Sequence, residues 1–463
     1  MLSTLIVLLL SSLYSLSIPL TDHCLWSTLH SLPTTSLRRL SISTTSSSDP
    51  IIFSSNLSLL FSLCPLLAWF NLHDTSIFFS LNISSCHYLS TLSITDSNVV
   101  EIIGLELLIN LSTFTIKNCF NLDLNFKFNP KCQIKRSTLA LEHHELSNVL
   151  SKYSNNELNF LEIFGLEEIS SIIQFKNLKT IHLFEVLLPE FSTENFNYLE
   201  VLVLYASKVA HLILKNCNYL KELELHSLTE CVYVEVPNEL KISNLYVTNM
   251  DINDFLIILE QCNYLLTLKL SNLQTPKDFI LPSFNNLKFQ YLDTFECAHC
   301  FIFEILPVMR RLKTLLIDIV DFAGTLTINF DNFPQLQRLL LFGISFNFES
   351  YSPTLEKVVI DNCSAFDLTL LGNCKNIMDL TISYGTFSHF SFDFLVNLRR
   401  LRVFSYRGNV FECYNFLSQL PLLECLFLTM FCQRQSLSES TEDQQHRLEL
   451  LPLRVVSVEL TIF

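Results

Sequence analysis

Two stretches of the chain are almost the same: Cys217–Leu225 reads CNYLKELEL, and Cys262–Leu270 reads CNYLLTLKL. Each contains the spacing L-x-x-L-x-L, which in the first stretch falls on Leu220, Leu223 and Leu225. The last two leucines are two residues apart, so they lie on the same face of a short β-strand. One short strand cannot bury that face alone, but neighbouring strands of a parallel sheet bury it jointly. The spacing therefore predicts a stack of short parallel strands, one for each copy of the motif.

The motif recurs along most of the chain at a mean spacing of about 22 residues. Weaker copies lie around Leu139/Leu141 and Phe289/Leu292, and marginal ones at Leu37/Leu40/Ile42 and Leu453/Val456/Val458. This even distribution of apolar residues indicates a solenoid of short units. The clear copies are Leu67/Phe70/Leu72, Leu89/Leu92/Ile94, Leu111/Phe114/Ile116, Leu158/Leu161/Ile163, Leu178/Ile181/Leu183, Leu199/Leu202/Leu204, Leu220/Leu223/Leu225, Ile242/Leu245/Val247, Leu265/Leu268/Leu270, Leu312/Leu315/Ile317, Leu336/Leu339/Leu341, Leu355/Val358/Ile360, Ile377/Leu380/Ile382, Leu398/Leu401/Val403 and Leu423/Leu426/Leu428.

This pattern resembles the leucine-rich repeat family. The phrase KNCNYL at Lys215–Leu220 is similar to the NCxxL phrase of cysteine-containing and Treponema-type repeats. Where the commonest subtypes carry a ladder of asparagines, this chain has other residues, among them Thr75, Ser97, Cys119 and Cys297. The resemblance implies an α/β solenoid with a curved parallel β-sheet on the concave side and short helical or extended segments on the convex side. It also implies a non-catalytic recognition protein that binds a protein partner.

The composition and the motifs of the chain exclude several classes of function. Apolar residues make up 49% of the chain, charged residues 16%, and the net charge is −15. The acidic balance argues against a nucleic-acid partner. The seven glycines have no phosphate-binding spacing, and no metal-binding or catalytic motif occurs. The cluster Glu142–Glu145 is interpreted as a strand end or turn, and the CxxC at Cys297–Cys300 lacks the second pair that a structural zinc site needs. We therefore expect no enzyme activity, no cofactor and no metal.

The two ends of the chain differ from its repeats. Residues 1–17 have an apolar core and small residues before position 18, as in a signal peptide, and no transmembrane segment is expected after this leader. Residues 18–60 are expected to form an N-terminal cap region with a Ser/Thr-rich loop. Residues 61–432 hold the repeats, and residues 433–463 a polar loop and C-terminal cap. This organisation predicts a secreted or surface-associated protein; an intracellular adaptor of the substrate-receptor type and a structural coat component are the alternatives.

A secreted chain can carry glycans on Asn-x-Ser/Thr sequons. We expect Asn56, Asn82 and Asn362 to be accessible, and Asn110 not, because it directly precedes a predicted strand. The chain has 15 cysteines. Those in phase with the repeat are expected to be buried thiols, whereas the terminal pairs Cys24–Cys64 and Cys425–Cys432 are better candidates for disulfides.

The motif also predicts which side chains face solvent on the concave sheet, namely those two, four and six residues after the first leucine. In the middle repeats these positions hold an unusual number of aromatic and apolar residues. Exposed aromatic rows are typical of interaction sites, although a covering loop or a generally apolar composition also accounts for them. The predicted partner-binding residues are Phe160, Phe164, His182, Phe184, Val203 and Tyr205, flanked by Glu222 and Glu224.

Overall fold

The structure of the chain is a computed structural model. It describes residues 15–19, 36–44, 50–119, 121–140, 143–153, 158–166, 170, 172–228, 231, 233–273, 289–299, 308–319, 325–362, 371–372, 374–383, 395–406, 420–432 and 455–462. The chain divides into two compact units, Met1–Pro237 and Asn238–Phe463.

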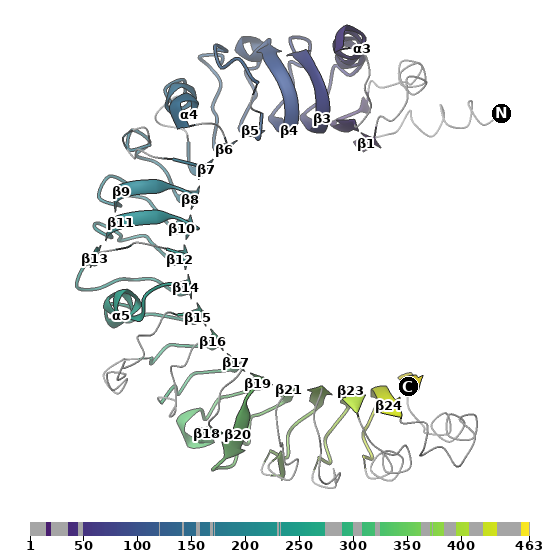
Figure 1. Ribbon diagram of the computed structural model, residues 1–463, viewed down its shortest axis with the longest axis vertical. Helices are drawn as coiled ribbons and strands as arrows, with labels where there is room; N and C mark the ends of the chain where they lie inside the picture. Colours follow the sequence, from purple (N-terminus) through teal and green to yellow (C-terminus); the bar gives the residue numbers. More distant parts are fainter. Residues whose placement is uncertain are drawn as a thin grey trace, which may run out of the picture. The chain divides into compact units, whose positions relative to one another are not determined.

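The first unit is built on a parallel sheet whose strands follow one another in chain order, as Figure 1 shows. Each copy of the motif supplies one strand, and we call these the inner strands. They are β1 (Ser15–Pro19), β2 (Arg39–Thr44), β3 (Trp69–Asn82), β4 (Thr91–Ile103), β5 (Thr113–Lys117), β6 (Arg136–Ala140), β7 (Phe160–Phe164), β8 (Thr180–Phe184), β10 (Val201–Tyr205) and β12 (Glu222–His226).

The second unit repeats this plan, again with parallel pairing in chain order. Its last strand lies where the sequence predicts one near the C-terminus. The inner strands are β14 (Asn244–Thr248), β15 (Thr267–Ser271), β16 (Thr294–Ala298), β17 (Thr314–Asp318), β19 (Arg338–Phe342), β21 (Lys357–Asp361), β22 (Asp379–Ser383), β23 (Arg400–Tyr406), β24 (Cys425–Cys432) and β25 (Val455–Ile462).

The segments that return from one inner strand to the next vary in structure, and they lie on the opposite side of each unit (Figure 1). Some are helical: α3 (Pro50–Leu63), η2 (Leu105–Leu107) and α4 (His143–Leu150) in the first unit, and α5 (Ile252–Glu260) and η5 (Phe330–Asn332) in the second. Others form small outer sheets: β9 (Leu187–Ser192), β11 (Lys208–Ile213) and β13 (Tyr233–Glu235) in the first unit, and β18 (Thr325–Ile328) and β20 (Ser345–Phe348) in the second. The predicted architecture is thus confirmed.

The core of each unit is made of ladders of aliphatic side chains. Pairing is in register, so Ile181, Leu202 and Leu223 lie side by side, and all three are fully buried. Burying such a side chain stabilises the fold by about 1.5–3 kcal/mol. The ladders account for much of the chain's high apolar content.

A left-handed residue follows most inner strands and starts the return segment. Gly165 has φ 71°, and the equivalent Glu185 and Ala206 have φ 53° and 48°. The next residue often carries a hydroxyl or thiol: the hydroxyl of Ser97 donates to the carbonyl of Thr95 at 2.7 Å, and that of Ser207 to Tyr205 at 2.9 Å. These local bonds occupy the position of the family's asparagine ladder.

Three local expectations require comment. Strand β1 includes Ser15–Ser17 of the predicted leader and pairs with β2, which lies within the Ser/Thr-rich segment predicted as a loop. The interpretation of Glu142–Glu145 as a strand end or turn is wrong, because helix α4 begins at His143. The motif near Phe289 begins instead at Leu292, since Phe295 and Cys297 are buried strand residues of β16.

Candidate functional site

The predicted patch lies on the inner face of the first unit, centred on strands β7, β8 and β10. Buried and half-buried residues alternate along β7 and β8, as the motif predicts. Register pairing aligns equivalent residues of neighbouring strands in three rows. The carboxyl-end row holds Lys117, Ala140, Phe164, Phe184, Tyr205 and His226. The middle row holds Thr115, Thr138, Glu162, His182, Val203 and Glu224, and the amino-end row Thr113, Arg136, Phe160, Thr180, Val201 and Glu222.

Aromatic rings contact one another along the carboxyl-end row. Phe164 and Phe184 stack with their centroids 4.6 Å apart and their planes at 12°. The ring centroids of Phe184 and Tyr205 are 5.8 Å apart, and those of Tyr205 and His226 are 5.7 Å apart. Tyr205 is 48% exposed, and both phenylalanines are half-buried. The row therefore presents a continuous aromatic strip that extends over three strands.

Cations cover two aromatic rings of strand β7, Phe164 in the strip and Phe160 in the amino-end row. The Nζ of Lys117 lies 4.6 Å from the ring centroid of Phe164, reaching past the small Ala140 between them in the row. The guanidinium of Arg136 lies 4.6 Å from the ring centroid of Phe160. Such contacts contribute about 0.5–1 kcal/mol at exposed sites. The aromatic surface left uncovered by these cations centres on Phe184 and Tyr205.

Histidine and glutamate side chains border the strip. The Nδ1 of His182 is 3.8 Å from a carboxylate oxygen of Glu162, and the His182 and Phe160 rings meet edge to face at 5.1 Å. The Nε2 of His226 is 3.1 Å from Glu224. The hydrogen bond with His226 lowers the pKa of Glu224 below its ordinary value. Glu222 lies half-buried on the same strand, so the acidic flank that the sequence predicts is present.

Val203 does not face solvent as predicted. It is only 7% exposed, although it has the correct phase on β10. Its neighbours in the middle row are His182 and Glu224, both of which have longer side chains. We attribute the burial of the short Val203 side chain to these longer neighbours. Its exposure was therefore set by the adjacent strands and not by its own motif.

The four sequons occupy different environments. Asn56 lies within helix α3, and Asn362 is exposed just after β21. Asn82 ends β3, and its Oδ1 accepts hydrogen bonds from the backbone N–H and the hydroxyl of Ser84, at 3.1 and 2.6 Å. Asn110 donates its side-chain N–H to the carbonyl of His87 at 3.0 Å, which a glycan would disrupt.

Tyrosines that directly precede the motif form a feature that the sequence reasoning missed. The ring centroids of Tyr198 and Tyr219 lie 6.0 Å apart in the first unit, and both side chains are exposed. In the second unit Tyr264 stacks on Tyr291 at 5.9 Å. All four tyrosines occupy the position just before the first leucine of the motif. Only positions after that leucine were considered in the sequence, so the tyrosines were not predicted.

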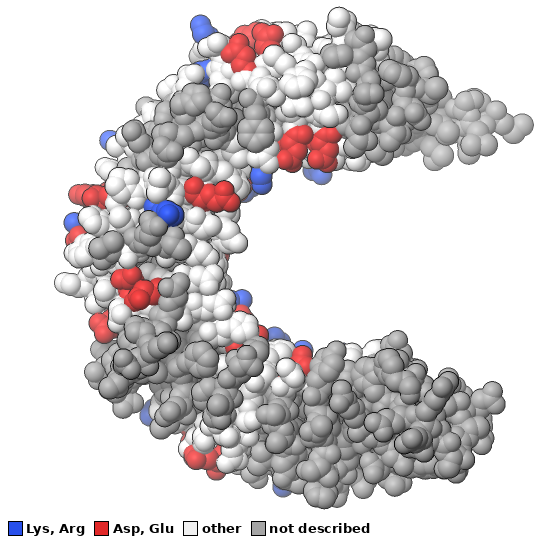
Figure 2. Space-filling model, viewed as in Figure 1, with Lys and Arg blue, Asp and Glu red and all other residues white. Residues whose placement is uncertain are grey.

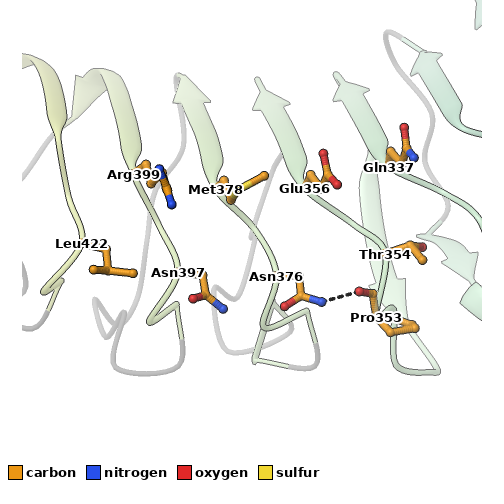
Figure 3. A pocket seen from close by; sticks show the side chains of 9 residues that line it. All are labelled: Gln337, Pro353, Thr354, Glu356, Asn376, Met378, Asn397, Arg399 and Leu422. Atoms are coloured by element: carbon orange, nitrogen blue, oxygen red, sulfur yellow. Dashed lines mark hydrogen bonds between the residues drawn. The ribbon is translucent and has the colours of Figure 1, made fainter.

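A hollow of about 440 Å³ opens in the second unit beside the amino ends of its inner strands. Figure 3 shows Gln337, Glu356, Met378 and Arg399 in a row along it, one from each of four successive repeats. Most of the side chains that line this hollow are polar. It does not resemble the enclosed apolar pockets that bind small cofactors.

The cysteines in phase with the repeat are buried thiols, as predicted. Burial raises the pKa of Cys86 and Cys262 to about 12. Such thiols are poor nucleophiles, because the thiolate is the reactive form. Cys425 is also a free thiol, so the disulfide predicted for it is wrong, whereas Cys24 lies outside the described residues.

Other kinds of site find little support in the described ranges. No three His, Cys, Asp or Glu side chains among these residues gather closely enough to hold a metal ion. No helix found there combines the length and apolarity needed to cross a membrane. Figure 2 shows charged residues scattered over the first unit, with much uncharged surface between them.

Comparison with solved structures identifies the fold. TLR13 in its complex with ssRNA13 aligns with a TM-score of 0.52 at 15% identity, covering 92% of this chain and 78% of that chain. A leucine-rich-repeat protein of Leptospira interrogans aligns with a TM-score of 0.43 at 16% identity, covering 90% of this chain and 93% of that chain. An internalin of Listeria monocytogenes aligns with a TM-score of 0.27 at 17% identity, covering 80% of this chain and 82% of that chain. No protein-family model and no curated protein matches the sequence. The chain is a leucine-rich-repeat solenoid by fold.

Proposed function

We propose that this solenoid is a non-catalytic recognition protein that binds a protein partner through the inner face of its first unit. The observation that carries this proposal is the aromatic strip Phe164, Phe184 and Tyr205, whose rings contact one another across three adjacent strands. Aromatic residues concentrate in the centres of protein interfaces, where they supply large apolar area at low entropic cost. The bordering glutamates and histidines supply the polar rim that such interfaces have.

The geometry favours a partner that presents an apolar anchor edged by basic groups. Among the described residues no cation lies over the rings of Phe184 and Tyr205, whereas Glu222 and Glu224 lie one strand further along. An arginine or lysine of the partner is the natural counterpart of this acidic flank. Arginine is favoured because its planar guanidinium both pairs with carboxylates and stacks on aromatic rings.

We test this proposal with two matched double variants of the full chain. Phe184→Ser with Tyr205→Ser removes the uncovered part of the strip. Phe78→Ser with Tyr233→Ser removes the same residue types from exposed positions away from the strip. Partners captured by tagged wild-type protein are quantified for all three proteins, after circular dichroism has shown equal folded content.

The expected result is at least a tenfold loss of captured partner for Phe184→Ser with Tyr205→Ser, and less than a twofold loss for the control. Removing two central aromatic anchors costs more than 1 kcal/mol each in typical interfaces. Equal capture by the two variants would refute the role of the strip.

We also propose that the protein is secreted or surface-associated, on the basis of the leader predicted for residues 1–17 and of its sequons. A C-terminally tagged chain is expected in the medium or the secretory lumen, with a mass that falls after glycosidase treatment. A cytosolic, unmodified chain that retains Met1 would instead support the intracellular adaptor, and ordered polymers the structural coat.

A further inference from the structure

A cluster of cations lies on the inner face of the second unit, on strands β19, β21 and β23, with strand β22 between the last two. Register pairing places Arg338, Lys357, Asp379 and Arg400 side by side, in the position two residues after the start of each motif. Arg402 lies two residues beyond Arg400 on the same face of β23. Four positive charges thus lie on three strands, β19, β21 and β23, around Asp379 of β22, in a chain whose net charge is −15.

Asp379 orders half of this cluster. Asp379 is only 5% exposed, and its two carboxylate oxygens contact the guanidinium groups of Arg400 at 3.4 Å and of Arg402 at 3.1 Å. The arginine side chains remain 56% and 36% exposed. The buried carboxylate therefore fixes two guanidinium groups while leaving part of each available to a ligand.

The other half of the cluster is uncompensated. Arg338 is exposed and Lys357 half-buried. Neither forms an ion pair with any residue in the described ranges. Besides Asp379, the only carboxylate lining this site is Glu356, so the described lining has an excess of positive charge. Such an excess attracts anions and raises their association rate.

The cations line a second hollow of about 330 Å³. This hollow shares Glu356 and Met378 with the hollow of Figure 3, so the two form one continuous furrow across the strands. Inner strands lie about 4.8 Å apart, which puts Lys357 and Arg400, two strands apart, at roughly 10 Å. A peptide in the polyproline II conformation has three residues per turn and rises about 3.1 Å per residue, so carboxylates three residues apart lie on one face and match this spacing.

We propose that this furrow binds an acidic peptide segment, with its glutamate or aspartate side chains on Arg338, Lys357, Arg400 and Arg402. A single-stranded nucleic acid fits less well. Proteins that bind single-stranded nucleic acid without sequence preference also stack bases on aromatic side chains, and the residues that line these two hollows include none.

The test uses the full chain and a fluorescein-labelled peptide of about ten residues with glutamate at every third position and serine elsewhere. Its counterpart has glutamine in place of glutamate, and a single-stranded oligonucleotide of similar length is the third probe. Binding is measured by fluorescence anisotropy at low and physiological salt. We expect the glutamate peptide to bind most tightly, with an affinity that falls as salt rises.

Two charge-reversal variants separate the local site from the overall charge. Arg338→Glu with Lys357→Glu is expected to weaken binding of the glutamate peptide at least tenfold. Lys127→Glu with Lys131→Glu changes the net charge equally at exposed positions of the other unit, and a change below twofold is expected. Equal losses in both variants, equal affinity for the glutamine peptide, no measurable binding, or tighter binding of the oligonucleotide would each overturn the proposal.

Discussion

Replacing Gly104 with alanine is expected to disrupt the packing of two adjacent repeats. Gly104 follows β4 and precedes the short helix η2, with φ 97° and ψ 6°. A Cβ at this position would lie 2.5 Å from the Cα of Ser84 and 2.6 Å from its backbone nitrogen. Both atoms belong to the main chain of the preceding repeat, so no side-chain rotation relieves the clash.

The expected cost has two parts. A left-handed conformation costs an alanine about 1–2 kcal/mol, from which the lower entropy of the unfolded alanine chain subtracts about 0.4–1 kcal/mol. Forcing extra volume into a packed site adds about 1–3 kcal/mol. Gly104→Ala should therefore lower the free energy of unfolding by about 2–4 kcal/mol. Gly165→Ala, at φ 71°, carries mainly the conformational part and should cost about 1 kcal/mol.

Tryptophan fluorescence provides the assay, because the chain has two tryptophans and one of them, Trp69, lies on β3 directly beside β4. Urea unfolding is followed by the tryptophan emission of the wild type and both variants. Since repeat proteins unfold in parts, the transition near β3 and β4 is compared rather than a global midpoint. Equal midpoints for Gly104→Ala and Gly165→Ala would show that the contact with Ser84 has no energetic consequence, and the reasoning would fail.

Two further predictions concern buried thiols and glycans. The raised pKa values of Cys86 and Cys262, about 12 against 9.0 for the ordinary thiol, mean that the unfolded chain releases protons first. Stability is then unaffected below pH 9 and falls above it, by about 1.4 kcal/mol per pH unit for each thiol. The urea midpoint should therefore fall less between pH 8.5 and pH 10.5 in Cys86→Ala than in the wild type. An equal fall in both proteins would contradict this reasoning. In a secreted chain, glycan mapping should find Asn82 occupied and Asn110 unmodified, and the reverse would contradict the hydrogen bond to His87.

The inner strands were predictable because one short motif carries all the information that they need. Two apolar residues two positions apart define the buried face, and the neighbouring repeat supplies the partner strand. The return segments carry no such constraint. Helix α5, with Asp251 as its N-cap, and the outer strands β9 and β11 both close the core. Their form depends on local capping and length, which the repeat does not specify.

The misplaced repeat near Phe289 shows how register is decided. Phe289, Leu292 and Phe295 are spaced by three, so two registers satisfy the first half of the motif. The second half distinguishes them, because it requires an apolar residue two positions later. Starting at Phe289 puts Thr294 there, whereas starting at Leu292 puts Cys297, which is fully buried. A shift of three residues also exchanges the two faces of the strand: a motif that started at Phe289 would put Phe295 on the solvent-facing side, whereas Phe295 is fully buried.

For the candidate site, the repeat phase identified outward-facing residues but not their degree of exposure. Val203 and Tyr205 lie two positions apart on β10 with the same predicted environment, yet one is buried and the other is 48% exposed. The difference arises from the lengths of side chains on adjacent strands, which belong to repeats about 22 residues away in sequence. The same lateral contacts place Lys117 over Phe164 across two strands.

The backbone turns that end the inner strands bear directly on binding at the aromatic strip. Phe164, Phe184 and Tyr205 are each followed by a left-handed residue. The N–H of each such residue donates to the last carbonyl of the next strand: Gly165 to Phe184 at 2.9 Å, Glu185 to Tyr205 at 2.9 Å, and Ala206 to His226 at 2.7 Å. These bonds fix the main chain on both sides of every ring, and ring contacts restrict the side chains. A strip ordered in this way loses little conformational entropy when a partner covers it. The strained turns and the aromatic rings are therefore two parts of the proposed binding surface, in which the repeat supplies the rigidity.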